Sequence, residues 1–524
     1  MKKLEEVFET WEAVIGLEIH AELTTLDTKM FCGCKLEFGA DPNTHTCPVC
    51  LGLPGALPVP NKAAIESIVL AGLATNCDIE KHSMFYRKNY MYPDMAKNFQ
   101  TTQGPVAFCM RGHLDLDVDG PAARERYRLD DLAAGESDGN ITRTEDGYVA
   151  HVGITRIHME EDAGKMVHVG GGEGRIAGAT HSLVDYNRAG TPLIELVTEP
   201  DLRTPEEARL FMQKLRQIYL AIGISDCSME EGSLRCDGNV SLRRRGAEEF
   251  GTKTELKNMN SFKNLHDGLA YEICRQAEVL EEGGVIYQET RHWDPSAKRT
   301  IVMRVKETAD DYRLFPEPDL APYDLSDAFI ERVRAKLPEL PDQKARRFEE
   351  AFGLTAYDAR HLVEHRETSR FFEACMEAAG DEAAKLAKPV ANLVINDVTA
   401  YLNAEGVALA ATPLSPARAV ELVRLQASDA ISSKQAKQVF AAVLAEDKDP
   451  EAIVEERGMK QVSDAGAIEA VVAEVIAANP DEVARYKDGN TKVIGFFVGQ
   501  CMKKMRGQGN PKVINELLAR RLAE

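Results

Sequence analysis

The sequence predicts an α+β protein: an N-terminal part of mixed α/β structure with a metal ribbon, followed by two all-α parts. Three observations support this fold class. Residues 1–300 are rich in glycine, proline and short alternating segments, which are typical of strands. From about residue 325 to residue 402 the pattern becomes that of charged helices. After a proline-containing stretch at 412–416 the helices become rich in alanine.

These changes of pattern predict three domains, because 524 residues are too many for one hydrophobic core. The predicted domains cover residues 1–300, 301–408 and 409–524. In the first domain, residues 12–20 and 238–243 alternate as strands do, and residues 205–220 have helical spacing. Residues 342–352 and 465–477 predict helices in the second and third domains.

Composition excludes several classes of protein. The start of the chain turns acidic before an apolar segment develops, and no apolar run approaches the ~20 residues of a membrane span. A cytoplasmic protein without a membrane partner is therefore expected. The net charge of −21 argues against a general nucleic-acid coat, although a local basic patch could still bind RNA. Of the eleven cysteines, seven stand singly, as reduced thiols do in a cytosolic protein.

The other four cysteines form two close pairs, Cys32 with Cys34 and Cys47 with Cys50, separated by 12 residues. Zn²⁺ takes four thiolates in a tetrahedron, and two short pairs on facing turns can supply them. We therefore predict a structural zinc ribbon over residues 31–51. Unconnected thiols or two disulfides are the alternative, and His45 could replace one ligand because Cys-x-Cys is a tight pair. Four protein ligands leave no open position, so catalysis must lie elsewhere.

Polar residues alternate in two predicted strands of the first domain. Glu18, His20 and Glu22 share one face of the first strand, about 6.6 Å apart by strand rise. Residues 156–162 repeat the pattern with a histidine, a glutamate and an aspartate. Carboxylates grouped in this way suit Mg²⁺ that bridges the phosphates of a nucleotide, whereas a solvated acidic strand face is the alternative.

Two absences in the sequence limit the chemistry. The chain lacks the Gly-x-x-x-x-Gly-Lys-Ser/Thr loop, so a nucleotide would not be held as in a P-loop enzyme. It also lacks a glycine- and serine-rich nucleophile loop of the kind that amidases use to hydrolyse glutamine. Any nitrogen that the protein transfers must therefore come from elsewhere.

Six segments together resemble the B subunit of the tRNA-dependent aspartyl/glutamyl amidotransferases. They cover residues 15–23, 47–55, 87–94, 157–165, 185–195 and 252–262, in this order along the chain. The resemblance implies a cradle domain that carries the active site, a helical domain, and a tail domain that reaches the tRNA. It also implies three partners: an amidase (glutaminase) subunit, a small third subunit, and misacylated tRNA(Gln) or tRNA(Asn).

The implied reaction uses ATP to phosphorylate the side-chain carboxylate of Glu-tRNA(Gln) or Asp-tRNA(Asn), and ammonia then displaces the phosphate. Phosphoryl transfer needs positioning and neutralised charge, which fits Mg²⁺ on carboxylates beside a cation. The residues that match the family's motifs are expected to act as follows. Magnesium would be held by Glu18, His20, Glu160 and Glu161; Lys88 and Arg188 would act beside them; and Asp162, Asp185 and Asn187 would bind substrate or ATP.

The resemblance also implies an ammonia tunnel and a tRNA-binding tail. The candidates for the tunnel are Lys253, Glu255, Lys257, Asn258 and Asn260, for which a structural polar network is the alternative. Residues 487–524 hold eight lysines and arginines against three acids, a local excess of five positive charges. Lys503, Lys504 and Arg506 in that stretch would contact phosphates, although a solvated helix end has the same composition.

Two rival functions remain open at this point. A zinc-ribbon adaptor could bind tRNA without catalysis, and a carboxylate–amine ligase could act without an amidase partner. The two acidic strand faces favour catalysis over the adaptor. The charged stretch at 106–148 receives no function, and the sequence does not distinguish between the two tRNA substrates.

Overall fold

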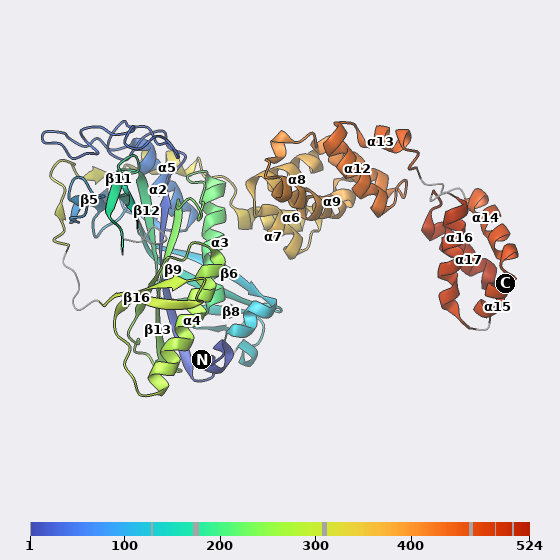
Figure 1. Ribbon diagram of the computed structural model, residues 1–524, viewed down its shortest axis with the longest axis horizontal. Helices are drawn as coiled ribbons and strands as arrows, with labels where there is room; N and C mark the ends of the chain where they lie inside the picture. Colours follow the sequence, from blue (N-terminus) through green and yellow to red (C-terminus); the bar gives the residue numbers. More distant parts are fainter. Residues whose placement is uncertain are drawn as a thin grey trace. The chain divides into compact units, whose positions relative to one another are not determined.

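A fourteen-stranded sheet organises the N-terminal part of the protein in the computed structural model (Figure 1). The structure describes residues 2–126, 129–170, 178–305, 312–460, 465–487, 489–505 and 508–523. The central strand order is β16-β15-β14-β13-β1-β12-β9-β5-β4-β17, and β6 and β8 also pair with the long strand β9. The strands of this sheet are β1 (Trp11–Glu22), β2 (Asp78–Ile79), β4 (Phe85–Asn89), β5 (Phe99–Gln103), β6 (Cys109–Asp119), β7 (Ser137–Asp138), β8 (Ile141–Arg143), β9 (Gly147–Glu161), β12 (Pro192–Thr198), β13 (Leu234–Arg244), β14 (Thr254–Lys257), β15 (Glu289–Asp294), β16 (Arg299–Val305) and β17 (Phe315–Pro316).

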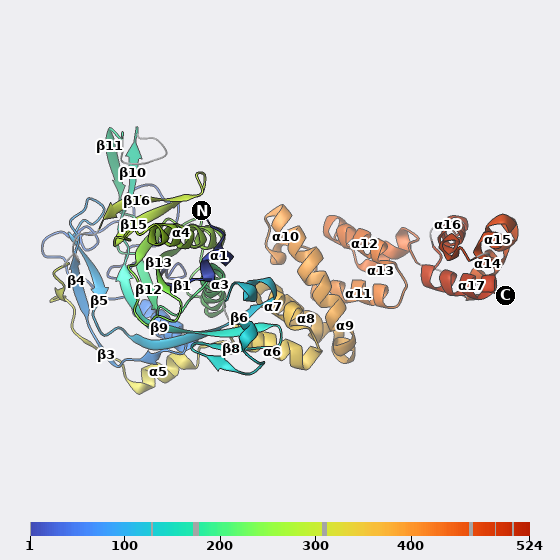
Figure 2. The same ribbon diagram turned by 90° about the horizontal axis from the view of Figure 1, so that it is seen from below.

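Two small two-stranded sheets accompany the large sheet. β3 (His82–Ser83) pairs with β18 (Tyr323–Asp324), and β10 (Lys165–Val169) pairs with β11 (His181–Asp185). Figure 2 shows β10 and β11 projecting away from the large sheet. The chain between β9 and β12 therefore leaves the sheet and returns to it, so that residues 185–191 lie just before β12.

Helices cover one face of the large sheet. α2 (Lys62–Ala74) and α3 (Pro205–Ile222) pack against β6, and α4 (Phe262–Glu281) packs against β13. The strand alternation accounts for this arrangement: Leu17, Ile19 and Ala21 of β1 are almost fully buried in the core between the sheet and the helices. The even-numbered side chains of β1 point to the opposite face.

Local sequence signals explain the bounds of α3. Thr204 is the N-cap, and its side chain accepts a hydrogen bond from the backbone N–H of Glu207 at 3.0 Å. Pro205 occupies the first helical turn, and Gly223 ends the helix with a left-handed φ of +72°. The predicted helix at 205–220 is confirmed, with its end two residues further along.

The chain divides into two compact units, residues 1–340 and 341–524. In the second unit, every element of secondary structure among the described residues is a helix. Its buried apolar residues form two clusters, one between residues 345 and 454 and one between 468 and 522. The α-helices from the end of the first unit onward are α5 (Asp327–Arg334), α6 (Pro341–Phe352), α7 (Ala356–Val363), α8 (Arg366–Ala379), α9 (Ala383–Asn392), α10 (Thr399–Glu405), α11 (Pro416–Ala427), α12 (Ser433–Glu446), α13 (Pro450–Glu456), α14 (Ala465–Ala478), α15 (Pro480–Lys487), α16 (Ile494–Lys504) and α17 (Pro511–Ala523).

A mixed α/β part followed by an all-helical part is therefore confirmed, whereas the division into three domains stays a prediction. The expected boundary at 300/301 falls within β16, and residues 315–324 still pair with β4 and β3. The expected boundary at 408/409 falls within the cluster of residues 345–454. In both places β pairing or core packing continues across the position where the pattern of the sequence changes.

The charged stretch at 106–148 extends the large sheet. Within its described residues, β6 pairs with residues 147–157 of β9, β8 pairs with residues 148–150 of β9, and β7 pairs with β8. The short 3₁₀ turn at Gly120–Glu125 follows β6. Among the residues that the structure describes, no helix has the length and apolar character needed to cross a bilayer.

Candidate active site

The face of the large sheet opposite the helices carries polar side chains from adjacent strands, and we call it the polar face. In the antiparallel register, His20 of β1 lies opposite Glu195 of β12, and Glu195 lies opposite His158 of β9. Thr102 of β5 lies opposite Glu160 of β9. Because paired residues point to the same side of a sheet, strands from distant parts of the sequence bring these groups together.

His20, Glu160 and Glu195 form the first group on the polar face. Each offers one ligand atom, and these atoms lie within 4.8 Å of one another. His20 Nε2 is 3.2 Å from Glu195 Oε2. Two carboxylates and an imidazole are a donor set that suits a divalent cation, and the open sides of such a site remain for water or phosphate oxygens.

Neighbouring side chains hold the two carboxylates of this group. His158 Nε2 lies 3.2 Å from Glu160 Oε1 and 3.7 Å from Glu195 Oε2. Thr102 Oγ1 donates to Glu160 Oε1 at 2.7 Å, and Gln100 Nε2 donates to Glu160 Oε2 at 2.9 Å. Every carboxylate oxygen of Glu160 therefore has a fixed donor, which orients the side chain before any ligand binds.

The charges of the first group support one another. Burial alone would lower the pKa of His20, but the hydrogen bond and charge of Glu195 raise it above its ordinary value. Burial alone would raise the pKa of Glu160, but the hydrogen bond and charge of His158 lower it, and Lys88 contributes in the same direction. The predicted Lys88 thus lies close enough to act on the group electrostatically.

Glu18 belongs to a second group and not to the first. Its Oε1 accepts a hydrogen bond from Asn239 at 3.0 Å, and it gathers with Asp237 and Glu255 within 4.8 Å. Lys257 Nζ lies 2.5 Å from Asp237 Oδ2 and 3.3 Å from Glu255 Oε1. Glu18 lies two residues before His20 on β1. Its acidic neighbours come from β13 and β14 and not from β9.

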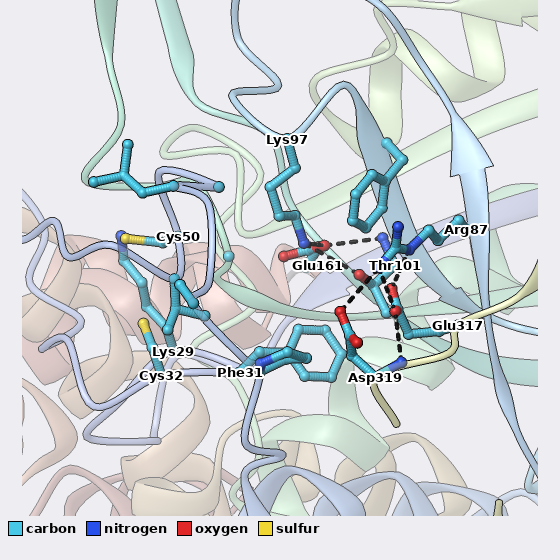
Figure 3. Close-up of a pocket in the computed structure, with 17 residues that line it drawn as sticks. Lys29, Phe31, Cys32, Cys50, Arg87, Lys97, Thr101, Glu161, Glu317 and Asp319 are labelled. Carbon is cyan, nitrogen blue, oxygen red and sulfur yellow. Dashed lines mark hydrogen bonds and ion pairs between the residues drawn. The ribbon is translucent and has the colours of Figure 1, made fainter. Parts of the chain in front are cut away.

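Glu161 points to the other face of the sheet, because successive side chains of a strand alternate. It pairs with Lys97, and its Oε1 accepts from the backbone N–H of Thr101 at 2.9 Å. These three residues line a cavity of about 160 Å³ beside the cysteine pairs (Figure 3). The predicted set of four magnesium ligands therefore stays a prediction: of its members, the structure places His20 and Glu160 together with Glu195, and Glu18 and Glu161 elsewhere.

Asp162 follows β9 and is buried between two guanidinium groups. Its Oδ2 lies 2.5 Å from Arg235 Nη2, and its Oδ1 lies 3.4 Å from Arg188 Nη2. Glu22 at the end of β1 shares a hydrogen bond with Asp162, and burial together with that neighbour raises the pKa of Glu22 to about 8. The predicted Asp162 and Arg188 thus lie together at one end of the polar face, next to Arg235, which pairs with His20 across β1 and β13.

Asp185 and Asn187 do not join this group. Asp185 Oδ1 accepts from the backbone N–H of Asn43 at 2.9 Å. Asn187 Oδ1 accepts from the backbone N–H of His45 at 2.8 Å, and Asn187 Nδ2 donates to the carbonyl of Asp41 at 2.8 Å. Their expected contact with substrate or ATP stays a prediction, and the structure shows these side chains bonded to the loop between the cysteine pairs.

The four predicted cysteines gather as the spacing indicates. Cys32, Cys34, Cys47 and Cys50 bring their sulfurs within 4.8 Å of one another, and Cys47 Sγ is 3.9 Å from Cys50 Sγ. The edge of a tetrahedron with Zn–S bonds of ~2.3 Å is about 3.8 Å, so this donor set fits zinc. The hydrogen bond from the Cys32 thiol, followed by lesser effects that include Lys29, lowers the pKa of Cys50 to about 5.

The remaining predicted residues occupy two separate regions. Glu255 and Lys257 lie on β14 in the second acidic group, whereas Lys253, Asn258 and Asn260 are exposed around that strand. Lys503 and Lys504 occupy the last turn of α16, where Lys504 pairs with Glu474. Arg506 lies outside the described residues.

Glu195 is the residue that sequence reasoning missed, together with its neighbours Gln100 and Thr102. A signal for Glu195 was present: it is a single acid in the apolar segment Pro192–Thr198. A charge in the middle of a buried strand is costly without partners, and therefore indicates that partners exist. Its proximity to His20 could not be inferred without the strand order.

The chain is similar to known proteins along nearly its whole length. Residues 13–331 match the family model described as the GatB/GatE catalytic domain, and residues 370–522 match the GatB domain. The chain is 50% identical over 514 residues to the aspartyl/glutamyl-tRNA(Asn/Gln) amidotransferase B subunit of Carboxydothermus hydrogenoformans, a match that covers 98% of this chain and 99% of that one. It is 48% identical over 515 residues to the protein of the same name from Geotalea daltonii, with 98% and 99% covered. It is 47% identical over 509 residues to that of Brevibacillus brevis, with 97% and 98% covered.

Proposed function

The chain belongs to the family of aspartyl/glutamyl-tRNA(Asn/Gln) amidotransferase B subunits, and from that membership we propose how its polar face performs the reaction. The enzymes of this family are ligases that convert misacylated Glu-tRNA(Gln) or Asp-tRNA(Asn) into the amidated aminoacyl-tRNA. The side-chain carboxylate of the aminoacyl group is a poor electrophile at neutral pH. ATP must therefore activate it before nitrogen can replace an oxygen.

Two steps achieve the conversion. A carboxylate oxygen attacks the γ-phosphorus of ATP, the bond from that phosphorus to the β,γ-bridging oxygen breaks, and an acyl phosphate and ADP form. Ammonia then attacks the carbonyl carbon, the carbon–oxygen bond to phosphate breaks, and the amide, inorganic phosphate and one proton are released. Both steps move negative charge between oxygens, so stabilisation of charge and accurate placement provide most of the catalysis.

The convergence of His20, Glu160 and Glu195 is the observation that carries this proposal. These three residues would hold magnesium, which supplies neutralisation of the phosphate charge when it is bound. Lys88 lies near the same carboxylates, where its ammonium can attract a phosphate oxygen. Arg188, whose side chain is 37% exposed, would contact the anionic aminoacyl end or a phosphate.

The other parts of the chain would support this site. The four cysteines would hold zinc as a structural ion, because all four positions around it are protein ligands. The amidase (glutaminase) subunit would supply ammonia, a small third subunit would accompany it, and the enzyme would act in the cytoplasm. Residues 1–300 would form the cradle, 301–408 the helical domain and 409–524 the tail, in which Lys503 and Lys504 would contact tRNA phosphates.

The ATP step can be tested with the complex of the chain and its amidase partner. We expect ADP to form when misacylated tRNA, ATP and Mg²⁺ are all present, with one ADP per amide formed when glutamine is added. Thin-layer separation of labelled nucleotide and of the released amino acid measures both products. Amidation without ADP formation, or tRNA binding without either product, would contradict the proposal; the latter result is that expected of a non-catalytic adaptor.

The second acidic group would serve the passage of ammonia, and the position of Lys257 among three acids next to the first group supports this role. Replacing Lys257 by methionine should lower glutamine-dependent amidation about tenfold, because a water-excluding polar path would be disrupted. Amidation with added ammonium chloride should stay within about threefold of the unchanged protein. Lys263→Ala on the exposed side of α4, where Lys263 pairs with Asp267 at 2.6 Å, is the matched control. Equal losses with both nitrogen sources would count against a tunnel at this position.

A further inference from the structure

The loop of residues 185–191, which we call the clamped loop, lies between the cysteine ribbon and the end of β9. On the ribbon side, Lys29 Nζ donates to the carbonyls of His45 at 2.8 Å and Tyr186 at 3.0 Å. The backbone N–H of Met30 donates to the carbonyl of Gly190 at 2.8 Å. Lys29 is completely buried, so its ammonium joins the two segments out of contact with solvent.

Two asparagines exchange hydrogen bonds across this contact. Asn43 of the ribbon accepts from the backbone N–H of Tyr186 at 2.8 Å and donates to the carbonyl of Val184 at 3.0 Å. Asn187 of the clamped loop accepts from His45 and donates to Asp41, both at 2.8 Å. Each side chain uses both its oxygen and its nitrogen on the backbone of the other segment, so the relative position of the two segments is strongly fixed.

The other side of the clamped loop is bonded to the residues that follow β9. The backbone N–H of Gly190 donates to the carbonyl of Asp162 at 2.9 Å, and that of Asp162 donates to the carbonyl of Thr191 at 2.9 Å. Arg188 Nε donates to the carbonyl of Ala163 at 3.0 Å. Gly190 has a φ of +86°, so the backbone here has a conformation that side-chain-bearing residues rarely adopt.

We propose that Asn43 and Asn187 are positioning residues, through which the cysteine ribbon holds Arg188 against Asp162 for the reaction on the polar face. This inference rests on the proposed function. Arg188 directly follows Asn187, and its guanidinium reaches Asp162 from the loop that the two asparagines hold. An anionic oxygen of the aminoacyl carboxylate or of a transferred phosphate is the chemical group that Arg188 then meets.

The test compares Asn187→Ala and Asn43→Ala with Thr46→Ala, in the complex that carries out amidation. Thr46 Oγ1 donates to Asn43 within the ribbon at 3.3 Å, so this control removes a hydrogen bond of the ribbon without touching the clamped loop. Both asparagine variants should lower kcat for tRNA-stimulated ATP cleavage about tenfold or more. KM for ATP and tRNA, zinc content and the unfolding midpoint should stay close to those of the unchanged protein, as should all parameters of Thr46→Ala.

A double variant separates positioning from a general structural effect. If Asn187 acts through Arg188, Asn187→Ala with Arg188→Ala should be no slower than Arg188→Ala alone, because the arginine that Asn187 positions is already gone. Losses that multiply would overturn the inference, and so would an unchanged kcat in the single variants. If the Asn187→Ala variant loses zinc, the Asn187→Asp variant is tested in its place, since the aspartate side chain still accepts from His45.

Loss of zinc in Asn187→Asp as well would also overturn the inference, since the residue would then serve the folding of the ribbon itself. Failure of the proposed function would give a different result, because the unchanged protein itself would then form no ADP. Retained ADP formation in that protein together with normal kinetics in the asparagine variants defeats only the positioning role.

Discussion

Replacing Glu195 by glutamine should lower kcat for tRNA-stimulated ATP cleavage by about 10²–10³-fold, which corresponds to about 3–4 kcal/mol of transition-state stabilisation. The substitution keeps the shape of the side chain and removes one negative charge. Glu195 Oε2 lies 3.2 Å from His20 and 3.7 Å from His158, so the same change also replaces the negative charge that faces both rings by a neutral amide. Steady-state rates of ADP formation under saturating substrates measure the effect.

Two other glutamates make this prediction specific. Glu18→Gln should cost much less, about tenfold, because Glu18 bonds to Asn239 in the second group. Glu199→Gln is the matched control: this exposed residue lies just past the same strand and accepts from Thr155 at 2.7 Å. An equal loss for Glu18→Gln and Glu195→Gln would contradict the separate roles given to the two groups.

Replacing Glu207 by alanine should destabilise the first unit by about 3–5 kcal/mol. Glu207 is completely buried in the first turn of α3. Its Oε1 accepts from Arg126 at 2.9 Å and from the Tyr148 hydroxyl at 2.7 Å, and its Oε2 accepts from the backbone N–H of Arg203 at 2.6 Å. Alanine leaves a largely buried guanidinium and a buried hydroxyl without this acceptor, which is costly in a medium of low polarity.

The measurement can be confined to the first unit. Both tryptophans of the chain, Trp11 and Trp293, lie in residues 1–340, so urea unfolding followed by tryptophan fluorescence reports on that unit. The control is Glu206→Ala, which removes an ion pair with Arg209 on a more exposed side of the same turn and should cost less than about 1 kcal/mol. Equal costs for the two variants would show that burial of the Glu207 network does not contribute in this way.

Much of the fold could be predicted because its signals are local. The alternation of β1 assigned His20 to the polar face, and the spacing of the cysteines predicted a cluster that the structure assembles. The cap of α3 set its start. Glu161 could also have been excluded from the magnesium set by the same alternation, since it is adjacent to Glu160 in one strand.

The rest of the site depends on contacts between distant segments. Glu195 meets His20 only because β12 lies between β1 and β9, and strand order is not encoded in the pattern of any one strand. Asp185 and Asn187 have side chains that suit either a ligand or a turn. Their partners are backbone groups more than a hundred residues away, which no local rule of sequence identifies.

The opposite orientations of Glu160 and Glu161 limit where members of this family can gain or lose residues. One residue added or deleted in the second half of β9 would move each later side chain to the opposite face of the sheet. The acid beside His158 would then be exchanged for the one beside Lys97. The strand already has an irregularity opposite Val197 and Thr198 that sets this phase. Insertions can therefore accumulate in the turns of the 106–148 extension, whereas the strand that follows them must keep its residue count.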